Sequence, residues 1–174
     1  MSPISLHWFL PTASDSRGIV GGGHGASIQA TETLRGPRLP YLVQVAQAAE
    51  YNGFESVLSP TGLWCQDAWL TTAAISQHTE RLKFLVALRP GAMSPTLAAQ
   101  MAATYQDLTR GRLNVNVVAG GESTEQRAFG DFLDKDGRYA RTGEFLDIVS
   151  RLWDHEPPFD YRGEHLAVEQ ARLD

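Results

Sequence analysis

Short apolar runs alternate along the chain with longer stretches in which apolar residues recur at helical spacing. Residues 82–88 and 113–118 are two of these runs. Both are interpreted as apolar on both faces, which is typical of buried strands in a parallel sheet. Between them lies an Ala-rich segment at residues 94–109, long enough for the crossover helix that a parallel pair of strands requires. The middle of the chain therefore predicts a strand, a helix and a second strand parallel to the first.

The rest of the chain extends this alternation. Further strands are predicted at residues 4–10 and 54–59, and further helices at residues 39–52, 68–77 and 138–153. Residues 122–137 are expected to form a polar loop, and residues 157–173 a small hairpin around Gly163. Residues 12–38 form a long Gly-rich loop, which is either a lid or binding loop or a disordered segment.

Four strands, each followed by a helix, predict an α/β fold with a parallel sheet and right-handed crossovers. Two architectures have this order: an open doubly wound sheet and a (β/α)8 TIM-type barrel. The glycine fingerprint of a dinucleotide-binding open sheet is absent, because residues 11–14 follow the first strand as Pro-Thr-Ala-Ser. A complete barrel takes about 250 residues. The 174 residues then correspond to about the first four β/α units, the N-terminal half of a barrel.

Composition narrows the classes of function. The net charge is −5 and no long Lys/Arg run is present, so nucleic acid is not an expected partner. A single cysteine excludes an internal disulfide and favours a reducing compartment. The N-terminus lacks the pattern of a signal peptide, and no apolar run reaches the ~18 residues that a membrane span needs. These features predict a soluble, cytoplasmic protein that does not bind membranes.

Catalytic groups in a barrel lie at the carboxyl ends of the strands. The residues there are apolar or hydrogen-bonding, with few titratable groups, and no His/Asp/Glu cluster has the spacing of a metal site. An apolar pocket with a few polar groups suits a flat organic cofactor. The candidates at the four strand ends are Trp8, Leu10 and Thr12; Ser59, Thr61, Trp64 and Cys65; Leu88, Arg89 and Pro90; and Asn116, Val118, Ala119 and Gly120.

Several candidates also have a purely structural interpretation. Cys65 is either a small buried apolar residue or a functional thiol in its loop. Arg89 is either an anion-binding residue or the partner of a carboxylate such as Asp67. Asn116 lies in a Val-rich strand, where Asn is disfavoured, so a ligand contact is favoured for it. Tyr139, at a predicted helix start, is either a packing residue or a phosphate ligand.

Six segments of the chain closely resemble the bacterial luciferase-like flavin monooxygenases, and among these the two-component alkanesulfonate monooxygenases. The segments are WFLPT, YLVQVAQAAEYNGFESVLSPTG, CQDAW, TERLKFLVALRPGAMSPTLAAQMAAT, GRLNVNVVAGG and FLDKDGRYARTGEFLDIVSRLW. The resemblance implies a (β/α)8 barrel that takes reduced FMN from a separate NAD(P)H-dependent flavin reductase. With dioxygen, such enzymes cleave the carbon–sulfur bond of an organosulfur substrate, an alkanesulfonate, to give an aldehyde and sulfite.

The resemblance also implies roles for individual residues. Cys65 matches the cysteine of a Thr-Gly-x-x-Cys-x-Asp loop near the flavin, and Trp8 lines the floor of the pocket. Asn116 and Ala119 match positions beside the flavin, although the family pattern usually has Thr in place of Ala119. Tyr139 matches a contact to the flavin phosphate.

Two alternative functions remain. One is a deazaflavin-dependent oxidoreductase on the same fold. The other is a non-catalytic half-barrel that binds a partner chain. A half-barrel has two unpaired edges, at its first and fourth strands, and such edges favour association, so a homo-oligomer and poor turnover by the chain alone are expected.

Overall fold

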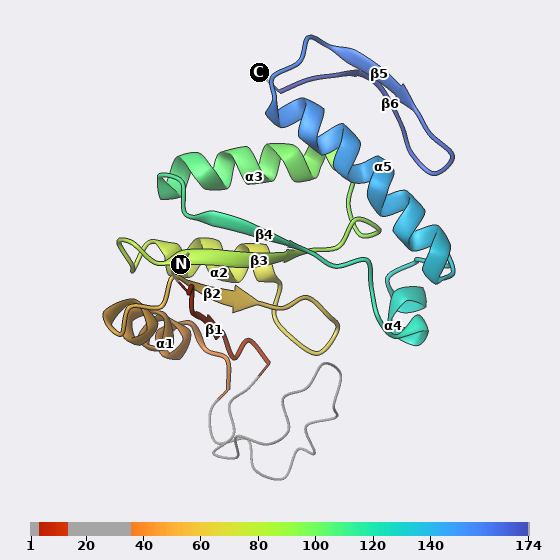
Figure 1. Cartoon of the computed structure of the whole chain (residues 1–174). Coiled ribbons are helices and arrows are strands. Elements are labelled where there is room, and N and C mark those ends of the chain that lie inside the picture. The colour runs from red at the N-terminus through yellow and green to blue at the C-terminus, as the bar shows by residue number, and fades with distance from the viewer. Residues whose placement is uncertain (1–3, 14–35, 174) are drawn as a thin grey trace. The chain divides into compact units, whose positions relative to one another are not determined.

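The computed structural model describes residues 4–13 and 36–173, and the predicted alternation of strands and helices is present in it (Figure 1). Residues 14–35 of the predicted Gly-rich loop lie outside the described residues. The elements are β1 (His7–Phe9), α1 (Leu39–Tyr51), β2 (Ser56–Ser59), α2 (Ala68–Ser76), β3 (Lys83–Leu88), α3 (Pro95–Thr109), β4 (Leu113–Val117), α4 (Ser123–Ala128), α5 (Lys135–Trp153), β5 (Phe159–Arg162) and β6 (Ala167–Ala171).

The first four strands form one sheet in the order β1-β2-β3-β4. Trp8 aligns with Val57, and Val57 with Phe84, in parallel register. β4 adds to β3 through two slanted bonds of 2.8 Å, from the Phe84 N–H to the Arg112 carbonyl and from the Val118 N–H to the Leu88 carbonyl. A parallel sheet built from consecutive strand–helix units confirms the α/β fold class.

Side chains in the turns before three helices set where those helices begin. Asp67 accepts a bond of 2.8 Å from the Leu70 N–H before α2, and Asp134 accepts one of 2.8 Å from the Gly137 N–H before α5. Ser94 caps α3, with Pro95 at its first position. Such caps satisfy N–H groups that the helix itself leaves unpaired.

The polar segment at residues 122–137 differs from the prediction. It contains the short helix α4, and α5 begins at Lys135 rather than at residue 138. The segment has too few apolar residues to show helical periodicity, so its pattern did not reveal α4. Because α5 starts earlier, Tyr139 lies in its second turn and not at its start. In the tail, β5 and β6 pair antiparallel, where a hairpin was predicted.

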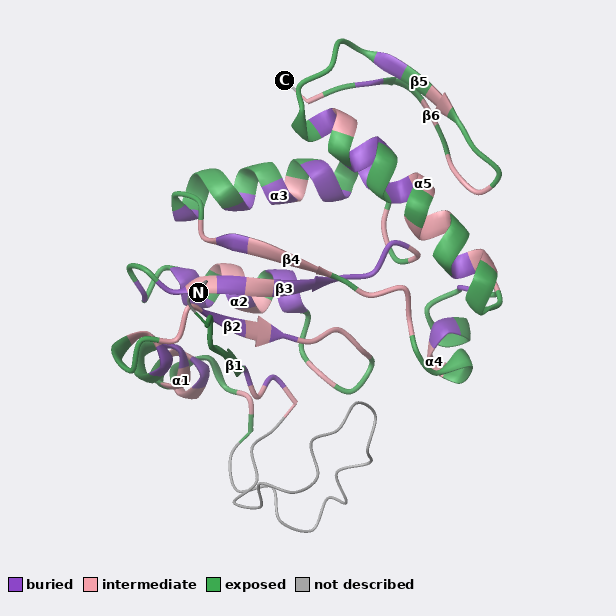
Figure 2. Cartoon of the chain, in the orientation of Figure 1, coloured by how far each residue is buried: buried purple, intermediate pink, exposed green. Residues whose placement is uncertain are grey.

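The expectation that the strands are buried on both faces was wrong in part (Figure 2). β2 and β3 are largely buried, whereas all three residues of β1 are exposed and β4 has mainly half-buried residues. Burial also alternates between neighbours: Val57 and Phe84 are fully buried, while Leu58 and Leu85 are half-buried. One face of the sheet is therefore less covered than the other.

The chain divides into two compact units. The first contains the described part of Met1–Ala87 together with Arg112–Val115, and the second contains Leu88–Gly111 and Asn116–Asp174, of which Asp174 is not described. In the first unit, α1 packs against α2 and β2. Its fully buried apolar side chains include Leu10, Leu42, Ala46, Val57, Ile75, Phe84 and Val86.

In the first unit, two charged side chains form hydrogen bonds with the backbone near the starts of β3 and β4. Glu50, near the end of α1, accepts hydrogen bonds from the N–H groups of Glu80, Arg81 and Leu82 at 3.0, 2.5 and 2.8 Å. Arg112 donates to the Ser76 carbonyl at the last residue of α2. Partial burial acts to raise the pKa of Glu50, but the three N–H donors outweigh it, so this pKa lies below its usual value.

The second unit contains a helical pair. α3 and α5 pack together, and the Trp153 indole Nε1 donates to the Ala99 carbonyl at 3.3 Å. Phe145, Ile148, Val149 and Leu152 line the buried stripe of α5, as its sequence pattern predicts. Also on α5, the Glu144 carboxylate accepts hydrogen bonds from the N–H groups of residues 164–166 and so holds the turn of the β5–β6 hairpin.

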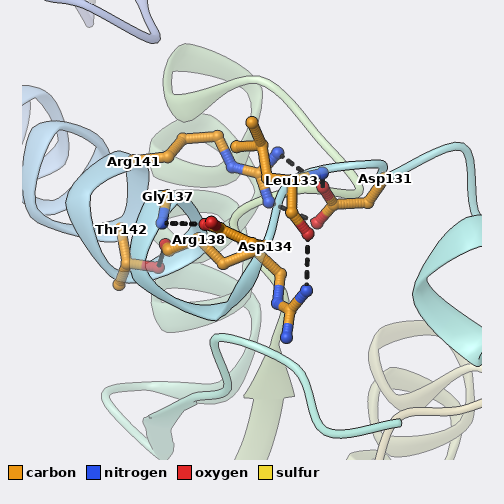
Figure 3. A network of polar contacts seen from close by, with 7 residues as sticks. All are labelled: Asp131, Leu133, Asp134, Gly137, Arg138, Arg141 and Thr142. Carbon is orange, nitrogen blue, oxygen red and sulfur yellow. Dashed lines mark hydrogen bonds and ion pairs between the residues drawn. The ribbon is translucent and has the colours of Figure 1, made fainter. Parts of the chain in front are cut away.

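A buried ion pair joins the loop before α5 to that helix (Figure 3). Arg141 contacts both carboxylate oxygens of Asp131, at 3.2 and 2.5 Å. Burial acts to raise the pKa of Asp131, but the hydrogen bonds from the Arg141 guanidinium and the Leu133 N–H outweigh it. This pKa therefore lies below its usual value. Gly91, in the loop after β3, lies so close that a β-carbon there would overlap Arg141 and Asp131. The ion pair therefore also fixes the β3–α3 loop.

We expect Glu50→Gln to destabilise the protein by about 1–2 kcal/mol at pH 7, because three N–H groups lose a charged acceptor. Since the folded-state pKa of Glu50 lies below the unfolded one, its contribution is complete above pH 4.5 and is lost as the pH falls through the folded-state pKa. Urea unfolding at pH 7 and pH 3.5 should therefore show a difference from wild type that shrinks in acid. Glu80→Gln, the same change on an exposed side chain, should have little effect. An equal loss in both variants would contradict the assigned role.

Asp131→Asn should cost about 3 kcal/mol, because it leaves the guanidinium of Arg141 buried without its carboxylate. Only 3% of the Asp131 side chain and 14% of the Arg141 side chain are exposed. Glu169→Gln breaks the Arg162 pair, which is 79% and 72% exposed, and should cost under about 0.5 kcal/mol. Chemical denaturation of the two variants measures this contrast, and similar midpoints would show that Asp131–Arg141 is not a stabilising pair.

Candidate active site

In the first unit, the predicted site residues lie at the carboxyl ends of β1 and β2 and in the loops that follow them. The Gln66 N–H donates to the Thr12 carbonyl at 3.1 Å, which ties the loop after β2 to the end of β1. In this loop Cys65 is half-buried, and its Sγ lies 3.6 Å from the carbonyl oxygens of both Pro60 and Gly62. Thr61 is half-buried beside them. The strand ends thus hold Cys65 in a defined position close to Thr12.

Two hydroxyl groups in this unit are buried without partners. Thr12 and Ser59 are 0% exposed, and neither Oγ has a hydrogen-bond partner among residues 4–13 and 36–173. Thr12 follows β1, and Ser59 is the last residue of the neighbouring strand β2. Unsatisfied buried hydroxyls are uncommon in folded proteins and suit a ligand or a bound water.

Trp8 is half-exposed, and its ring meets the Phe54 ring edge to face with centroids 5.3 Å apart. The register aligns it with Val57 on the buried face of the sheet. An aromatic side chain held by another ring on one side and open to solvent on the other is available for a further contact.

In the second unit, the predicted site residues lie at or after the carboxyl ends of β3 and β4. Arg89 is only 5% exposed; it pairs with Glu125 of α4 at 3.3 Å and lies over the Phe129 ring at 4.9 Å. The carboxylate beside Arg89 is therefore Glu125, whereas the Asp67 suggested by the sequence caps α2. Pairing with Glu125 neutralises much of the charge that Arg89 could offer to an anion.

Asn116, Ala119 and Tyr139 have accessible surface. Asn116 and Ala119 are half-buried at the end of β4, next to the end of β3, where the Val118 N–H bonds to the Leu88 carbonyl. Tyr139 is 59% exposed in the second turn of α5. Asn116, Ala119 and Arg89 thus lie on adjacent strand ends, with Tyr139 on a separate element of the same unit.

Gln126 is a polar residue that the sequence did not single out. It lies on α4, in the segment predicted as a loop, and is fully buried. Its amide Nε2 and Oε1 have no hydrogen-bond partner within the part of the chain that the structure describes. A buried Gln on a short polar helix has no signature in the local pattern, because its burial depends on the loop that covers it.

The chemistry of these groups is that of hydrogen bonding. The carboxyls with lowered pKa described above, Glu50 and Asp131, hold the fold together. Neutral hydroxyl and amide groups at the strand ends match the needs of a bound organic cofactor, which requires hydrogen-bond partners and orientation. Among residues 4–13 and 36–173, no three His, Cys, Asp or Glu side chains are grouped to hold a metal ion. None of the described helices is long and apolar enough to cross a membrane.

Solved structures with the same architecture support the fold. A long-chain alkane monooxygenase matches with a TM-score of 0.79 at 18% identity, over 100% of this chain and 49% of that one. The oxygenating constituent of 3,6-diketocamphane monooxygenase from Pseudomonas putida, in complex with FMN, matches with a TM-score of 0.71 at 18% identity, over 98% and 46%. An F420-dependent secondary alcohol dehydrogenase matches with a TM-score of 0.72 at 22% identity, over 97% and 48%.

At such identities the likeness shows the fold alone, and the chain spans about half the length of these structures. The comparison confirms the half of a barrel that the order of elements predicted. The family model described as luciferase-like monooxygenase matches residues 4–173, nearly the whole sequence. The chain therefore belongs to the luciferase-like monooxygenase family.

Proposed function

We propose that the chain is part of a flavin-dependent monooxygenase that uses reduced FMN and dioxygen to desulfonate an alkanesulfonate. The observation that carries the proposal is the family match across residues 4–173. The FMN complex of the 3,6-diketocamphane monooxygenase supports FMN as the cofactor. The sequence resemblance to alkanesulfonate monooxygenases supports the substrate, and a separate NAD(P)H-dependent flavin reductase would supply the reduced FMN.

The proposed reaction balances as follows. When bound, reduced FMN supplies the two electrons that activate dioxygen. One oxygen atom ends in the aldehyde and the other in water, while the carbon–sulfur bond breaks and sulfite leaves. The contribution of the protein to such chemistry is binding, orientation and exclusion of water.

Residues of the chain serve these tasks through hydrogen bonding and packing. Asn116 offers an amide beside the cofactor, and Tyr139 an exposed hydroxyl for its phosphate. Arg89, already paired with Glu125, orients the loop after β3. Cys65 lies in a loop fixed to the end of β1. The proposed set is Trp8, Thr61, Arg89, Asn116, Ala119 and Tyr139 for cofactor binding, with Cys65 as the candidate catalytic thiol.

A deazaflavin-dependent oxidoreductase is the second candidate. The F420-dependent secondary alcohol dehydrogenase shares the fold at 22% identity, the highest identity among the three structures compared. Flavins and deazaflavins have the same tricyclic outline, and neutral strand-end residues such as Asn116 suit either one.

Association with another chain is the third element of the proposal. All three residues of β1 are exposed, including Trp8 and Phe9, with 50% and 44% of their surface accessible. Unpaired strand edges favour pairing with other strands. We therefore expect a homo-oligomer or a partner chain, and a half-barrel with no catalysis of its own is the corresponding alternative. A cytoplasmic location, with neither nucleic acid nor membrane as a partner, fits the net charge of −5 and the single cysteine.

Spectral titration of the purified chain with FMN and with F420 tests which cofactor it prefers. We expect saturable binding of FMN and weaker binding of F420, with little sulfite released from alkanesulfonates when reduced FMN is supplied to this chain alone. Light scattering with and without FMN reports the oligomeric state. Preference for F420 would favour the dehydrogenase, and a complex with another chain that binds neither cofactor would favour the non-catalytic module.

Asn116→Ala should weaken FMN binding about five- to tenfold, the effect of one lost hydrogen bond of roughly 1–1.4 kcal/mol. Asn114→Ala is the matched control, because Asn114 lies two residues earlier on the same strand and is equally half-buried. Fluorescence titration of FMN measures both affinities. Equal losses in the two variants would mean that Asn116 has no specific contact with the cofactor.

A further inference from the structure

The side-chain amide of Gln126 is buried and has no hydrogen-bond partner among the described residues. Its backbone carbonyl accepts bonds from the N–H groups of Phe129 and Asp131 at 3.0 and 2.9 Å. Its side chain is 0% exposed, and within residues 4–13 and 36–173 neither amide atom has a hydrogen-bond partner. An amide in this state keeps the cost of desolvation without the gain of a hydrogen bond. The position therefore favours a partner from outside the described residues.

Gly120 packs directly against this amide. A β-carbon added to Gly120 would lie 2.5 Å from Cδ, 2.6 Å from Oε1 and 2.7 Å from Nε2 of Gln126. Gly120 has φ +103°, a conformation that residues with side chains rarely adopt. Gly120 itself is half-buried and Gly121 is exposed. A residue with a side chain at position 120 would therefore overlap the Gln126 amide.

The place of this amide is where ligands bind in α/β proteins. Gly120 lies in the loop that follows β4, three residues beyond Val117 at the carboxyl end of that strand. Ala119 and Asn116 precede it. Glu125, the neighbour of Gln126 on α4, pairs with Arg89, which also lies over Phe129. These contacts hold α4 in place. The Gln126 amide packs against Gly120 and has no hydrogen-bond partner among the described residues.

We propose that Gln126 is a cofactor-binding residue whose amide hydrogen-bonds to hydroxyl groups of the cofactor's polyol chain once the loop at Gly120 moves aside. The inference rests on the proposed flavin function. A carboxamide offers a donor, Nε2, and an acceptor, Oε1, and a hydroxyl can satisfy both. An ionised phosphate only accepts, so it would leave Oε1 unpaired and face it with like charge.

Gln126→Met tests the proposal, because it keeps the length of the side chain and removes both polar atoms. We expect the variant to bind FMN and riboflavin about tenfold more weakly than wild type, the effect of one or two lost hydrogen bonds. Lumiflavin has the same ring system without the polyol chain, so its affinity should not change. The unfolding midpoint in urea should rise, because a desolvated amide is replaced by an apolar group.

Gln100→Met is the control, since Gln100 is exposed on α3, and it should change neither affinity nor stability. Equal losses for FMN and lumiflavin would show that Gln126 contacts the ring and would overturn the assignment to the polyol chain. Unchanged FMN affinity would overturn the inference altogether. A lower midpoint for Gln126→Met would show that a water already satisfies the amide, and it would also overturn the inference. Failure of wild type to bind any flavin would instead refute the proposed function, and the inference with it.

Discussion

Parallel pairing of the first four strands is the constraint on which the rest of the structure depends. A parallel pair cannot be closed by a tight turn, so each strand must be followed by a crossover long enough to return the chain to the same end of the sheet. The helices α1, α2 and α3 are those crossovers. The same rule directs the carboxyl ends of the strands to one edge of the sheet, and Thr12, Ser59 and Asn116, far apart in sequence, lie at or close to these ends.

Charged side chains, rather than disulfides, stabilise the loops that this topology requires. Glu50 receives three N–H groups where β3 begins, and Glu144 receives the N–H groups of the hairpin turn. Asp131 and Arg141 join the loop before α5 to the helix. In each case a carboxylate accepts hydrogen bonds from backbone or guanidinium groups of another segment of the chain. A chain with one cysteine can fix long connections in this way.

Three polar side chains near the strand ends differ from these contacts, because they have no hydrogen-bond partner among the described residues. The hydroxyls of Thr12 and Ser59 and the amide of Gln126 are buried without partners in the described chain. Stability alone would favour apolar residues at such places, since a buried polar group without a partner costs free energy. Within each unit, such a group lies at or near the carboxyl end of a strand, which is the pattern expected where a fold gives up stability for ligand binding.

The sequence by itself determined the order of strands and helices, the parallel sheet, the half-barrel and the family, because these depend on local periodicity and on motifs of adjacent residues. It could not show α4, whose polar residues have no periodic apolar stripe. Nor could it show that Arg89 pairs with Glu125, 36 residues away, or that Glu50 binds the start of β3. Only the tertiary structure showed that Gly120 packs against the Gln126 amide and that this amide is buried. Burial of a polar side chain depends on residues that are distant in sequence but close in space. The local sequence pattern does not show which residues these are.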